Sequence, residues 1–407
     1  MTIALDTATM LAQLTQLGAI GHDAGDGRTR LAFGDADKQG RDQLVAWMHE
    51  LSLDITIDQI GNIFGTLTGS DPSLAPLMIG SHIDTVINAG MYDGCYGVLA
   101  GLAVLRALRS AGIVPRRSIV VAAFSNEEGV RYQPDMMGSL VCAGGIDVAQ
   151  VLDVIGTDGT RLGDELARIG YAGDLTPGVV VPHAYLELHI EQGPLLEYHA
   201  TQIGVVADLQ GISWQQITIN GVANHAGTTP LAMRHDAGWA AAAVITFVRQ
   251  LAQESGSTLA TVGSIQFSPN AINVIPQTAV LTLDMRDPDD QKLSAAEAHV
   301  AMFLQTIAAQ EGVTITSQRL VRFPAVHFDE SLVAEIAQAT AELGLSQRQM
   351  TSGAGHDAQM IARIAPAAMI FVPSQAGISH NPAEYTSDAD LIAGATVLLA
   401  VVQRLSR

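Results

Sequence analysis

The chain has 407 residues, 48% of them hydrophobic, so it is long enough for two domains with substantial cores. Its 41 acidic residues outnumber 21 basic ones, and the formal net charge of -20 argues against nucleic acid and anionic membranes as partners. With two cysteines, no recognisable signal peptide and apolar stretches shorter than the roughly 20 residues that span a bilayer, we expect a cytoplasmic protein.

The first half of the chain alternates predicted helices and strands, which is typical of an α/β layered domain. Residues 38–53 and 95–112 have helical periodicity. The segment 117–125 is an apolar run of the kind that is buried on both faces of a sheet. Further strands are predicted at 53–58, 62–69, 76–81 and 184–190.

Residues 211–325 follow a different order, β-α-β-β-α-β, which is the ferredoxin-like unit. Strands are predicted at 212–220, 259–268, 278–286 and 313–321, and helices at 235–253 and 294–312. Ser294, with Glu297 three residues later, predicts a capping box at the start of the second helix. The unit has the size of a separate α+β domain.

After residue 325 the alternation of helix and strand returns, with helices predicted at 331–344 and 359–365, a strand at 368–374 and a C-terminal helix. The simplest layout is one α/β domain formed by residues 1–210 and 326–407, interrupted by the insert at 211–325.

Metal-binding residue types follow the predicted strands. His82 and Asp84 come after the strand at 76–81, and Asp93 stands before the helix at 95–112. In open α/β sheets, ligands bind beyond the carboxyl ends of the strands. A histidine and carboxylates there would suit a divalent metal, although a loop of ordinary polar residues is the alternative.

Two adjacent glutamates, Glu127 and Glu128, end the apolar strand at 117–125. The alternative is a solvated loop. If the pair is functional, one carboxylate holds a cation and the other takes a proton from water.

Two more strand ends carry histidines. His189 lies in "ELHIEQG", between Glu187 and Glu191, and His380 lies in "GISHNPAEY" with Glu384. Four strand ends with such groups at one edge of the α/β part predict one metal site. Three histidines with Asp93 and Glu128 fit two metals that share a carboxylate better than a single four-coordinate ion.

The insert contributes polar residues that are poor core residues: His225, Asn270, Asn273 and Arg286. Together they suit a substrate with a carboxylate, which Arg286 would bind. The alternative for Arg286 is a salt bridge to Asp284 or Asp287. His356, in the polar turn "SGAGHDA", is a further candidate, unless that turn only caps a helix.

Eight motifs occur in an order that resembles the dinuclear-metal amidohydrolases of the peptidase M20 superfamily, over roughly residues 40–405. They are "GSHIDT", "DG..G", "NEEG", "ELHIEQGP..E", "NHAGTTP", "NVIP", "SGAGHDA" and "GISHNPAE". "ELHIEQG" and "SGAGHDA" resemble the branch of N-carbamoyl-L-amino-acid hydrolases, β-ureidopropionase and allantoate amidohydrolase. "NAG" before Asp93 replaces a commoner double glycine, and "IPQ" replaces "IPG".

The resemblance implies a role for each matching residue. It implies that two divalent ions (zinc, manganese, cobalt or nickel) are held by His82, Glu128, His189 and His380, with Asp93 as the bridging carboxylate. Glu127 resembles the general base, and Asp84 the carboxylate that orients His82 through its other ring nitrogen. We expect Glu187 and Glu191 to hold His189 and the strand end in place.

The resemblance also implies the substrate contacts Gln192, His225, Asn273, Arg286 and His356. It implies that the insert is a lid and dimerisation domain and that the partner subunit of a homodimer supplies His225 to the site. His225 would stabilise an oxyanion.

The implied activity is hydrolysis of the carbamoyl C–N bond of N-carbamoyl-L-amino acids, a small-molecule ureido acid substrate. Allantoate, ureidoglycolate or β-ureidopropionate hydrolysis at the same site remains an alternative. Less favoured alternatives are a metallo-exopeptidase and a binding protein without catalysis, which would not need Glu127.

Overall fold

The computed structural model describes residues 3–22 and 25–407. The chain forms two compact units, the first made of the residues up to Ala207 together with Phe328–Arg407, and the second of Asp208–His327. No helix in the described part of the chain is long and apolar enough to cross a membrane.

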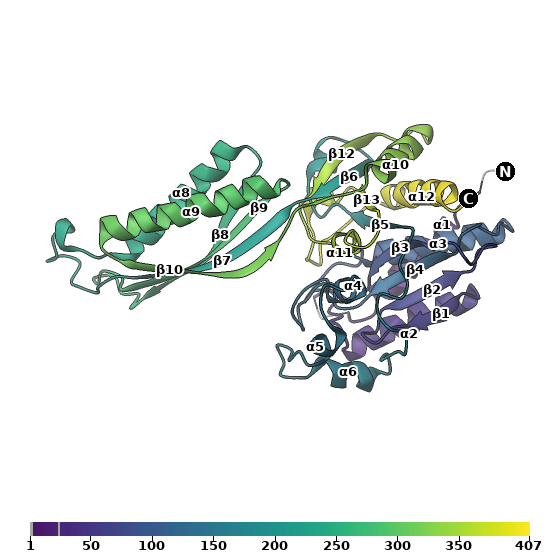
Figure 1. Cartoon of the computed structure of the whole chain (residues 1–407), viewed down its shortest axis with the longest axis horizontal. Helices are drawn as coiled ribbons and strands as arrows, with labels where there is room; N and C mark the ends of the chain where they lie inside the picture. The colour runs from purple at the N-terminus through teal and green to yellow at the C-terminus, as the bar shows by residue number, and fades with distance from the viewer. Residues whose placement is uncertain (1–2, 23–24) are drawn as a thin grey trace. The chain divides into compact units, whose positions relative to one another are not determined.

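The larger sheet has nine strands among the described residues, in the order β1-β2-β4-β3-β5-β13-β6-β11, with β12 also paired to β6 (Figure 1). All of these strands belong to the first unit except β11 and the last two residues of β6. The strands are β1 Asp54–Ile57, β2 Ile63–Leu67, β3 Leu77–His82, β4 Ile119–Phe124, β5 Ala184–Ile190, β6 Ile203–Leu209, β11 Val326–His327, β12 Gln347–Ser352 and β13 Ala367–Val372.

Helices surround this sheet. They are α1 Thr7–Gly18, α2 Asp35–Glu50, α3 Cys95–Ser110, α4 Met137–Cys142, α5 Val148–Leu152, α6 Leu162–Ile169, α7 Leu195–Tyr198, α10 Glu330–Glu342, α11 Asp357–Ile361, α12 Asp388–Leu405 and the 3-10 helix η2 Gln375–Gly377. Helices α3 and α12 pack on each other and on the sheet, and α11 packs on α4 and β5. The sequence prediction of an α/β fold is therefore confirmed.

The centre of the sheet explains why the polar motifs meet. Strands β4, β3, β5 and β13 are neighbours and run parallel, and all their residues are buried. Because parallel strands end at the same edge of a sheet, the segments that follow them converge. The buried apolar residues of these strands thus fix a shared position for the chemistry beyond their carboxyl ends.

The second unit contains β7 Gly211–Asn220, η1 Leu231–Met233, α8 Ala237–Ser255, β8 Leu259–Ser268, β9 Thr278–Asp287, α9 Asp290–Glu311 and β10 Thr314–Phe323. Its sheet order is β10-β7-β9-β8, and α8 and α9 lie side by side on one face (Figure 1). The core between helices and sheet is apolar, from Ile217 on β7 to Val244 on α8 and Val300 on α9. The β-α-β-β-α-β order is the one predicted.

Some local predictions were wrong. Helix α9 begins four residues before Ser294, because Asp289 accepts the backbone N–H groups of Gln291 and Lys292 and caps the helix there. Glu297 accepts a hydrogen bond from Ser213 instead of completing a capping box.

The chain passes between its two units at adjacent points. β6 and β11 form a short antiparallel pair, with Asp208 opposite His327, and the backbone N–H of Phe328 donates to Ala207 O at 2.9 Å.

Candidate metal centre and active site

The sheet brings the candidate ligands to one edge. In the strand register His82 at the end of β3 lies beside Phe124 at the end of β4, and His189 on β5 lies beside Phe371 on β13. His380 follows on the segment after β13. Except for His380, these side chains are buried.

Asp93 occupies the middle of the site, and its two oxygens face different partners. Oδ1 lies 3.5 Å from His82 Nε2 and 3.2 Å from His189 Nε2. Oδ2 lies 3.2 Å from His380 Nε2, which in turn is 3.5 Å from Glu128 Oε2. The structure therefore contains two groups of potential metal ligands that share one carboxylate. Three imidazoles and two carboxylates are a donor set that suits borderline divalent metals.

The turn from Asp93 into α3 depends on Gly94. Its φ is +63°, and a Cβ there would overlap the imidazole ring of His82. The Gly94 N–H also donates to His189 Nε2 at 3.0 Å. A glycine is therefore needed for the helix to begin this close to the two histidines.

The ring orientation of both buried histidines is set by backbone carbonyls. His82 Nδ1 is 3.0 Å from Asp84 O, and His189 Nδ1 is 2.9 Å from Ile190 O. In the neutral ring Nδ1 then carries the proton, and the Nε2 lone pair faces Asp93. This differs from the expectation for Asp84, whose carboxylate lies 3.8 Å from His82 Nδ1 and has another task.

The Asp84 carboxylate supports the glutamate pair after β4. Its two oxygens accept the backbone N–H groups of Glu127 and Glu128, each at 3.2 Å. Glu127 Oε2 then lies 3.4 Å from His82 Nε2, and Glu128 Oε1 accepts the Val86 N–H at 3.2 Å. The two adjacent glutamates are thus separated, with Glu127 beside His82 and Glu128 beside His380.

Burial and the neighbouring charges shift the pKa values of the carboxyl and imidazole groups in the site. Burial, and then the neighbouring Asp93 carboxylate, raises the pKa of Glu128 to about 8, and burial raises the pKa of Glu127 well above its usual value. Burial lowers the pKa of His82, but Glu127 and the other carboxylates outweigh it and raise that pKa well above normal. The Asp93 carboxylate is the main cause that raises the pKa of His380 to about 9. A divalent cation would replace the shared protons of such a site.

Glu187 and Glu191, on either side of His189, have structural partners. Glu187 is fully buried and accepts Ser81 Oγ at 2.6 Å and the Ala358 N–H at 2.8 Å, so it joins β3, β5 and α11. Glu191 accepts two backbone N–H groups at the start of α7, each at 2.8 Å. Neither carboxylate bonds His189 Nδ1; both support the strand end that carries it.

Gln192 lies within the candidate site. Its Nε2 donates to Asp93 Oδ2 at 2.7 Å and lies 3.2 Å from Ser379 Oγ, and its Oε1 is buried without a hydrogen-bond partner among the described residues. Its φ of +56° is uncommon for a residue with a side chain. The backbone is held there by Ser374 Oγ, which accepts the Gln192 N–H at 3.0 Å.

His356 is buried, although it lies in a polar turn that contains glycines. Its ring centroid is 4.5 Å from that of His189, and its Nε2 has no hydrogen-bond partner in the described part of the chain. Burial and the neighbouring His189 lower the pKa of His356 well below its usual value. Although it precedes α11, its side chain makes no capping bond, which disfavours the capping alternative.

The second unit holds the remaining predicted contacts, His225, Asn273 and Arg286. His225 is exposed, and its Nδ1 accepts the N–H groups of Gly227 at 3.0 Å and Thr228 at 3.2 Å. The Asn273 backbone carbonyl accepts the Ala226 N–H, which joins the two loops. The Arg286 guanidinium donates to Asp284, with Nη2 2.9 Å from Oδ2, so the alternative salt bridge is formed.

Two residues near Asp93 were not predicted as site residues. The sequence indicates Glu384 only as an acidic residue after a strand, and it gives no indication of Ser379. Glu384 is buried and contacts the backbone beside Asp93, and Ser379 lies between them. The spacing of Glu384 from His380 was the available signal, whereas a serine in a loop gives none.

Known proteins resemble this chain over nearly its whole length. An N-carbamoyl-L-amino-acid amidohydrolase of Rhizobium meliloti is 40% identical over 96% of this chain and 94% of its own. A ureidoglycolate hydrolase of Arabidopsis thaliana is 34% identical over 100% of this chain and 88% of its own. The crystal structure of an amidase of the hydantoinase/carbamoylase family from Burkholderia multivorans superposes with a TM-score of 0.96, at 40% identity, over 99% of this chain and 98% of that one.

Residues 78–404 match the family described as peptidase family M20/M25/M40. This range contains both groups that share Asp93, and it also contains the whole second unit. The chain belongs to peptidase family M20/M25/M40.

Proposed function

We propose that the protein is a metal-dependent amidohydrolase that cleaves the carbamoyl C–N bond of N-carbamoyl-L-amino acids, giving the L-amino acid, carbon dioxide and ammonia. The observation that carries this proposal is the pair of ligand groups on the two oxygens of Asp93, with Glu127 beside them, in a chain similar to N-carbamoyl-L-amino-acid amidohydrolases.

The donor set fits two divalent ions. His82 and His189 with Asp93 Oδ1 would hold one ion, and Glu128 and His380 with Asp93 Oδ2 would hold the other. Zinc, manganese, cobalt and nickel all suit imidazole and carboxylate ligands. When bound, such ions polarise a carbonyl and make water more acidic.

Glu127 is the proposed general base and acid. Its carboxylate is buried beside His82, and Asp84 holds its backbone. A base in this position would take a proton from the attacking water and return it to the nitrogen that leaves. Carbamate is then released and decays to carbon dioxide and ammonia.

Other residues are proposed to bind the substrate. Nδ1 of His225 accepts two backbone N–H groups, so Nε2 would present the N–H donor to the developing oxyanion. Gln192 and His356 would contact the ureido group, and Asn273 and Arg286 the carboxylate. Arg286 would then exchange its contact with Asp284 for the substrate.

The organisation of the enzyme is part of the same proposal. Residues 1–210 and 326–407 would form the catalytic domain, and 211–325 a lid and dimerisation domain. A homodimer in which the partner subunit supplies His225 is proposed, and the protein is expected in the cytoplasm. The acidic composition supports a small-molecule substrate over nucleic acid or membrane lipid.

Ureidoglycolate or allantoate hydrolysis is the second candidate, because the Arabidopsis thaliana relative is a ureidoglycolate hydrolase. β-Ureidopropionate is a further candidate, with the same site. A metallo-exopeptidase and a binding protein without catalysis are less favoured, the latter because Glu127 and the ligand set are intact.

The test is ammonia release by the purified protein, reconstituted separately with Mn²⁺ and with Zn²⁺. The substrates are N-carbamoyl-L-methionine, N-carbamoyl-β-alanine, ureidoglycolate and allantoate. Turnover of N-carbamoyl-L-methionine with little turnover of the others would support the first proposal. Turnover of ureidoglycolate or allantoate alone would favour the second candidate activity over the first. No turnover of any of the four substrates by metal-loaded protein would contradict both proposed activities.

A further inference from the structure

Glu384 joins the two chain segments that carry Asp93 and His380. Its Oε1 accepts the backbone N–H of Tyr92 at 2.9 Å and that of Asp93 at 3.3 Å. Its Oε2 accepts Ser379 Oγ at 2.8 Å, one residue before His380. The side chain is buried, with 6% of its surface exposed, so these protein groups replace the water that would otherwise solvate the carboxylate.

His380 depends on such a fixed segment more than the other two candidate histidines do. Its side chain is half exposed, and its backbone has a φ of +54° in the left-handed region. His82 and His189, by contrast, belong to buried strands. The 3.2 Å separation of His380 Nε2 from Asp93 Oδ2 is therefore set by how the segment after β13 is anchored.

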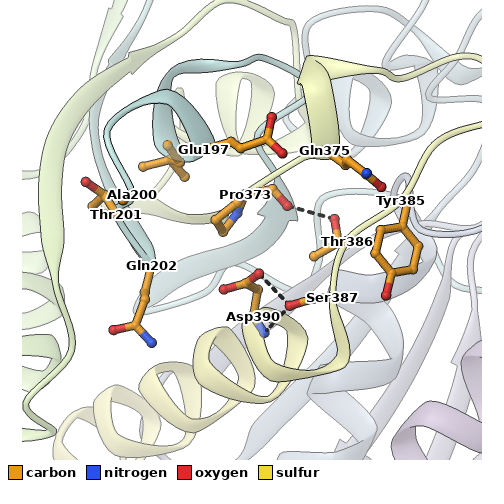
Figure 2. Close-up of a pocket in the computed structure, with 11 residues that line it drawn as sticks. Glu197, Ala200, Thr201, Gln202, Pro373, Gln375, Tyr385, Thr386, Ser387 and Asp390 are labelled. Atoms are coloured by element: carbon orange, nitrogen blue, oxygen red, sulfur yellow. Dashed lines mark hydrogen bonds between the residues drawn. The ribbon is translucent and has the colours of Figure 1, made fainter.

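The base of this segment is closed by its own hydrogen bonds. The Gln375 N–H donates to Tyr385 O. Thr386 Oγ1 donates to Pro373 O, and Ser387 Oγ donates to Asp390 at the start of α12 (Figure 2). These residues border a pocket of about 370 Å³. They fix the ends of the segment, while Glu384 fixes its middle to the Asp93 turn.

Gly90 provides the space for this contact. A Cβ on Gly90 would overlap the side chain of Glu384, because the carboxylate lies directly against the backbone before Asp93. This close approach explains why residue 90 must be a glycine, although its φ is not positive.

We propose that Glu384 is a positioning residue that sets the distance between Asp93 and His380, and thereby the ligand group that these two residues form with Glu128. This inference rests on the proposed function of the site as a metal centre. Glu384 itself does not bind metal or substrate in this assignment; it acts through the backbone of Asp93 and through Ser379.

Two substitutions separate the position of the side chain from its charge. In Glu384→Gln, Oε1 can still accept the Tyr92 and Asp93 N–H groups, and Nε2 can donate to Ser379 Oγ, which then acts as an acceptor. In Glu384→Ala all three bonds are lost. The edge-to-face contact of Tyr92 with Tyr385, at 6.4 Å, and the closed base remain in both variants, so both should fold.

Glu197→Ala is the matched control for Glu384→Ala, because each substitution removes a carboxylate that accepts a backbone N–H. The Glu197 carboxylate also accepts a backbone N–H of the segment after β13, from Ala376 at 2.6 Å, and no hydrogen bond or ion pair found among the described residues joins it to a candidate ligand. Its side chain lies at the pocket shown in Figure 2. If zinc binding weakened only because the segment became more mobile, this control would also bind zinc more weakly. If the effect is specific to the separation of Asp93 and His380, the control would bind zinc like the wild type.

The experiment measures Zn²⁺ binding to the full-length protein by chelator competition, with zinc per subunit determined by elemental analysis. For Glu384→Ala we expect one of the two zinc equivalents to bind about 10–100-fold more weakly, as for loss of groups that orient metal ligands. Glu384→Gln should recover most of this affinity, and Glu197→Ala should match the wild type. Denaturant unfolding checks that each variant is folded.

Wild-type affinity in Glu384→Ala, an equal loss in Glu197→Ala, or a loss in Glu384→Gln as large as in Glu384→Ala would each overturn the inference. Substrate turnover is measured separately. If the wild type binds zinc but hydrolyses no ureido substrate, the proposed function fails while the inference on Glu384 stands. If the wild type is active and Glu384→Ala binds zinc normally, the inference alone fails.

Discussion

The Asp84 carboxylate accepts the backbone N–H of Glu127 at 3.2 Å. Its other oxygen accepts the N–H of Glu128 at the same distance, so one buried side chain determines the directions of both glutamates. A charge-assisted bond to a backbone N–H is stronger than a neutral one. The position of the proposed base thus depends on a residue two positions beyond His82.

Asp84→Asn should lower kcat by about 10–100-fold, because the amide nitrogen would face one of the two N–H groups that the carboxylate accepts. The measurement is kcat and KM on the best ureido substrate. Asp71→Asn is the control, since Asp71 accepts the N–H and hydroxyl of Ser73 in an exposed turn. Unchanged kcat in a folded Asp84→Asn protein would contradict this role.

Glu127→Gln should retain bound metal and lose about 10²–10⁴-fold in kcat, because the amide cannot accept and return a proton. Elemental analysis and steady-state rates on the same preparation test this prediction. A variant with normal metal content and near-normal turnover would remove Glu127 from the role of base.

His225→Ala should lower kcat by about 10²–10³-fold with little change in folding, because it removes a preset donor to the oxyanion. The ring is exposed and its backbone contacts do not depend on the imidazole, apart from the two N–H groups at Nδ1. His299→Ala, at an exposed position of α9, is the control. Equal rates for the two variants would argue against the assignment.

Asp58 should make stability depend on pH away from the site. Burial, opposed by hydrogen bonds from Asn62 and Ile60, raises the pKa of Asp58 from 3.8 to about 6. Because the folded pKa exceeds the unfolded one, its contribution is full below pH 4 and is lost as pH rises through about 6. Relative to Asp58→Asn, the wild type should lose up to about 2–3 kcal/mol across this range.

The measurement is the free energy of unfolding in urea, for the wild type and Asp58→Asn, at several pH values from 4.5 to 7.5. The difference between the two proteins is the quantity of interest, since other groups titrate equally in both. Parallel curves would show that Asp58 keeps an ordinary pKa in the folded protein.

Bound metal should stabilise the folded protein as well as support catalysis. The carboxylates of Asp93 and Glu128 are buried close together, and a cation bound only to the folded state adds about 4 kcal/mol at a thousand times its Kd. Chelation should therefore lower the melting temperature and abolish ammonia release, and added Zn²⁺ or Mn²⁺ should restore both. An unchanged melting temperature after addition of the chelator would contradict this expectation.

The strand ends were predictable from sequence because periodicity and apolar runs locate buried parallel strands. His82, Glu127 and His189 could be placed at one edge on that basis. The strand β12 was missed, because "QRQMTS" is a polar strand at the side of the sheet with no apolar pattern. The start of α9 was missed because two capping signals, Asp289 and Ser294, compete within one turn and a half.

The partners of individual side chains were harder to predict than their location. Asp84 uses its backbone carbonyl for His82 and its carboxylate for the glutamates, a division that spacing alone does not reveal. Glu384 reaches Tyr92 across 292 positions in sequence, and only the fold brings these residues together. The pairing of Arg286 with Asp284 was one of two open alternatives, and sequence offered no energy difference between them.

Ala207 and Phe328, which flank the second unit in sequence, lie next to each other in the structure. Since these two residues are hydrogen-bonded neighbours, the 120 or so residues between them leave and rejoin the sheet at one point. A tight hairpin of two residues would bridge the gap after excision. We therefore expect that the second unit can be removed or exchanged as one segment, with all the candidate metal ligands remaining encoded outside it.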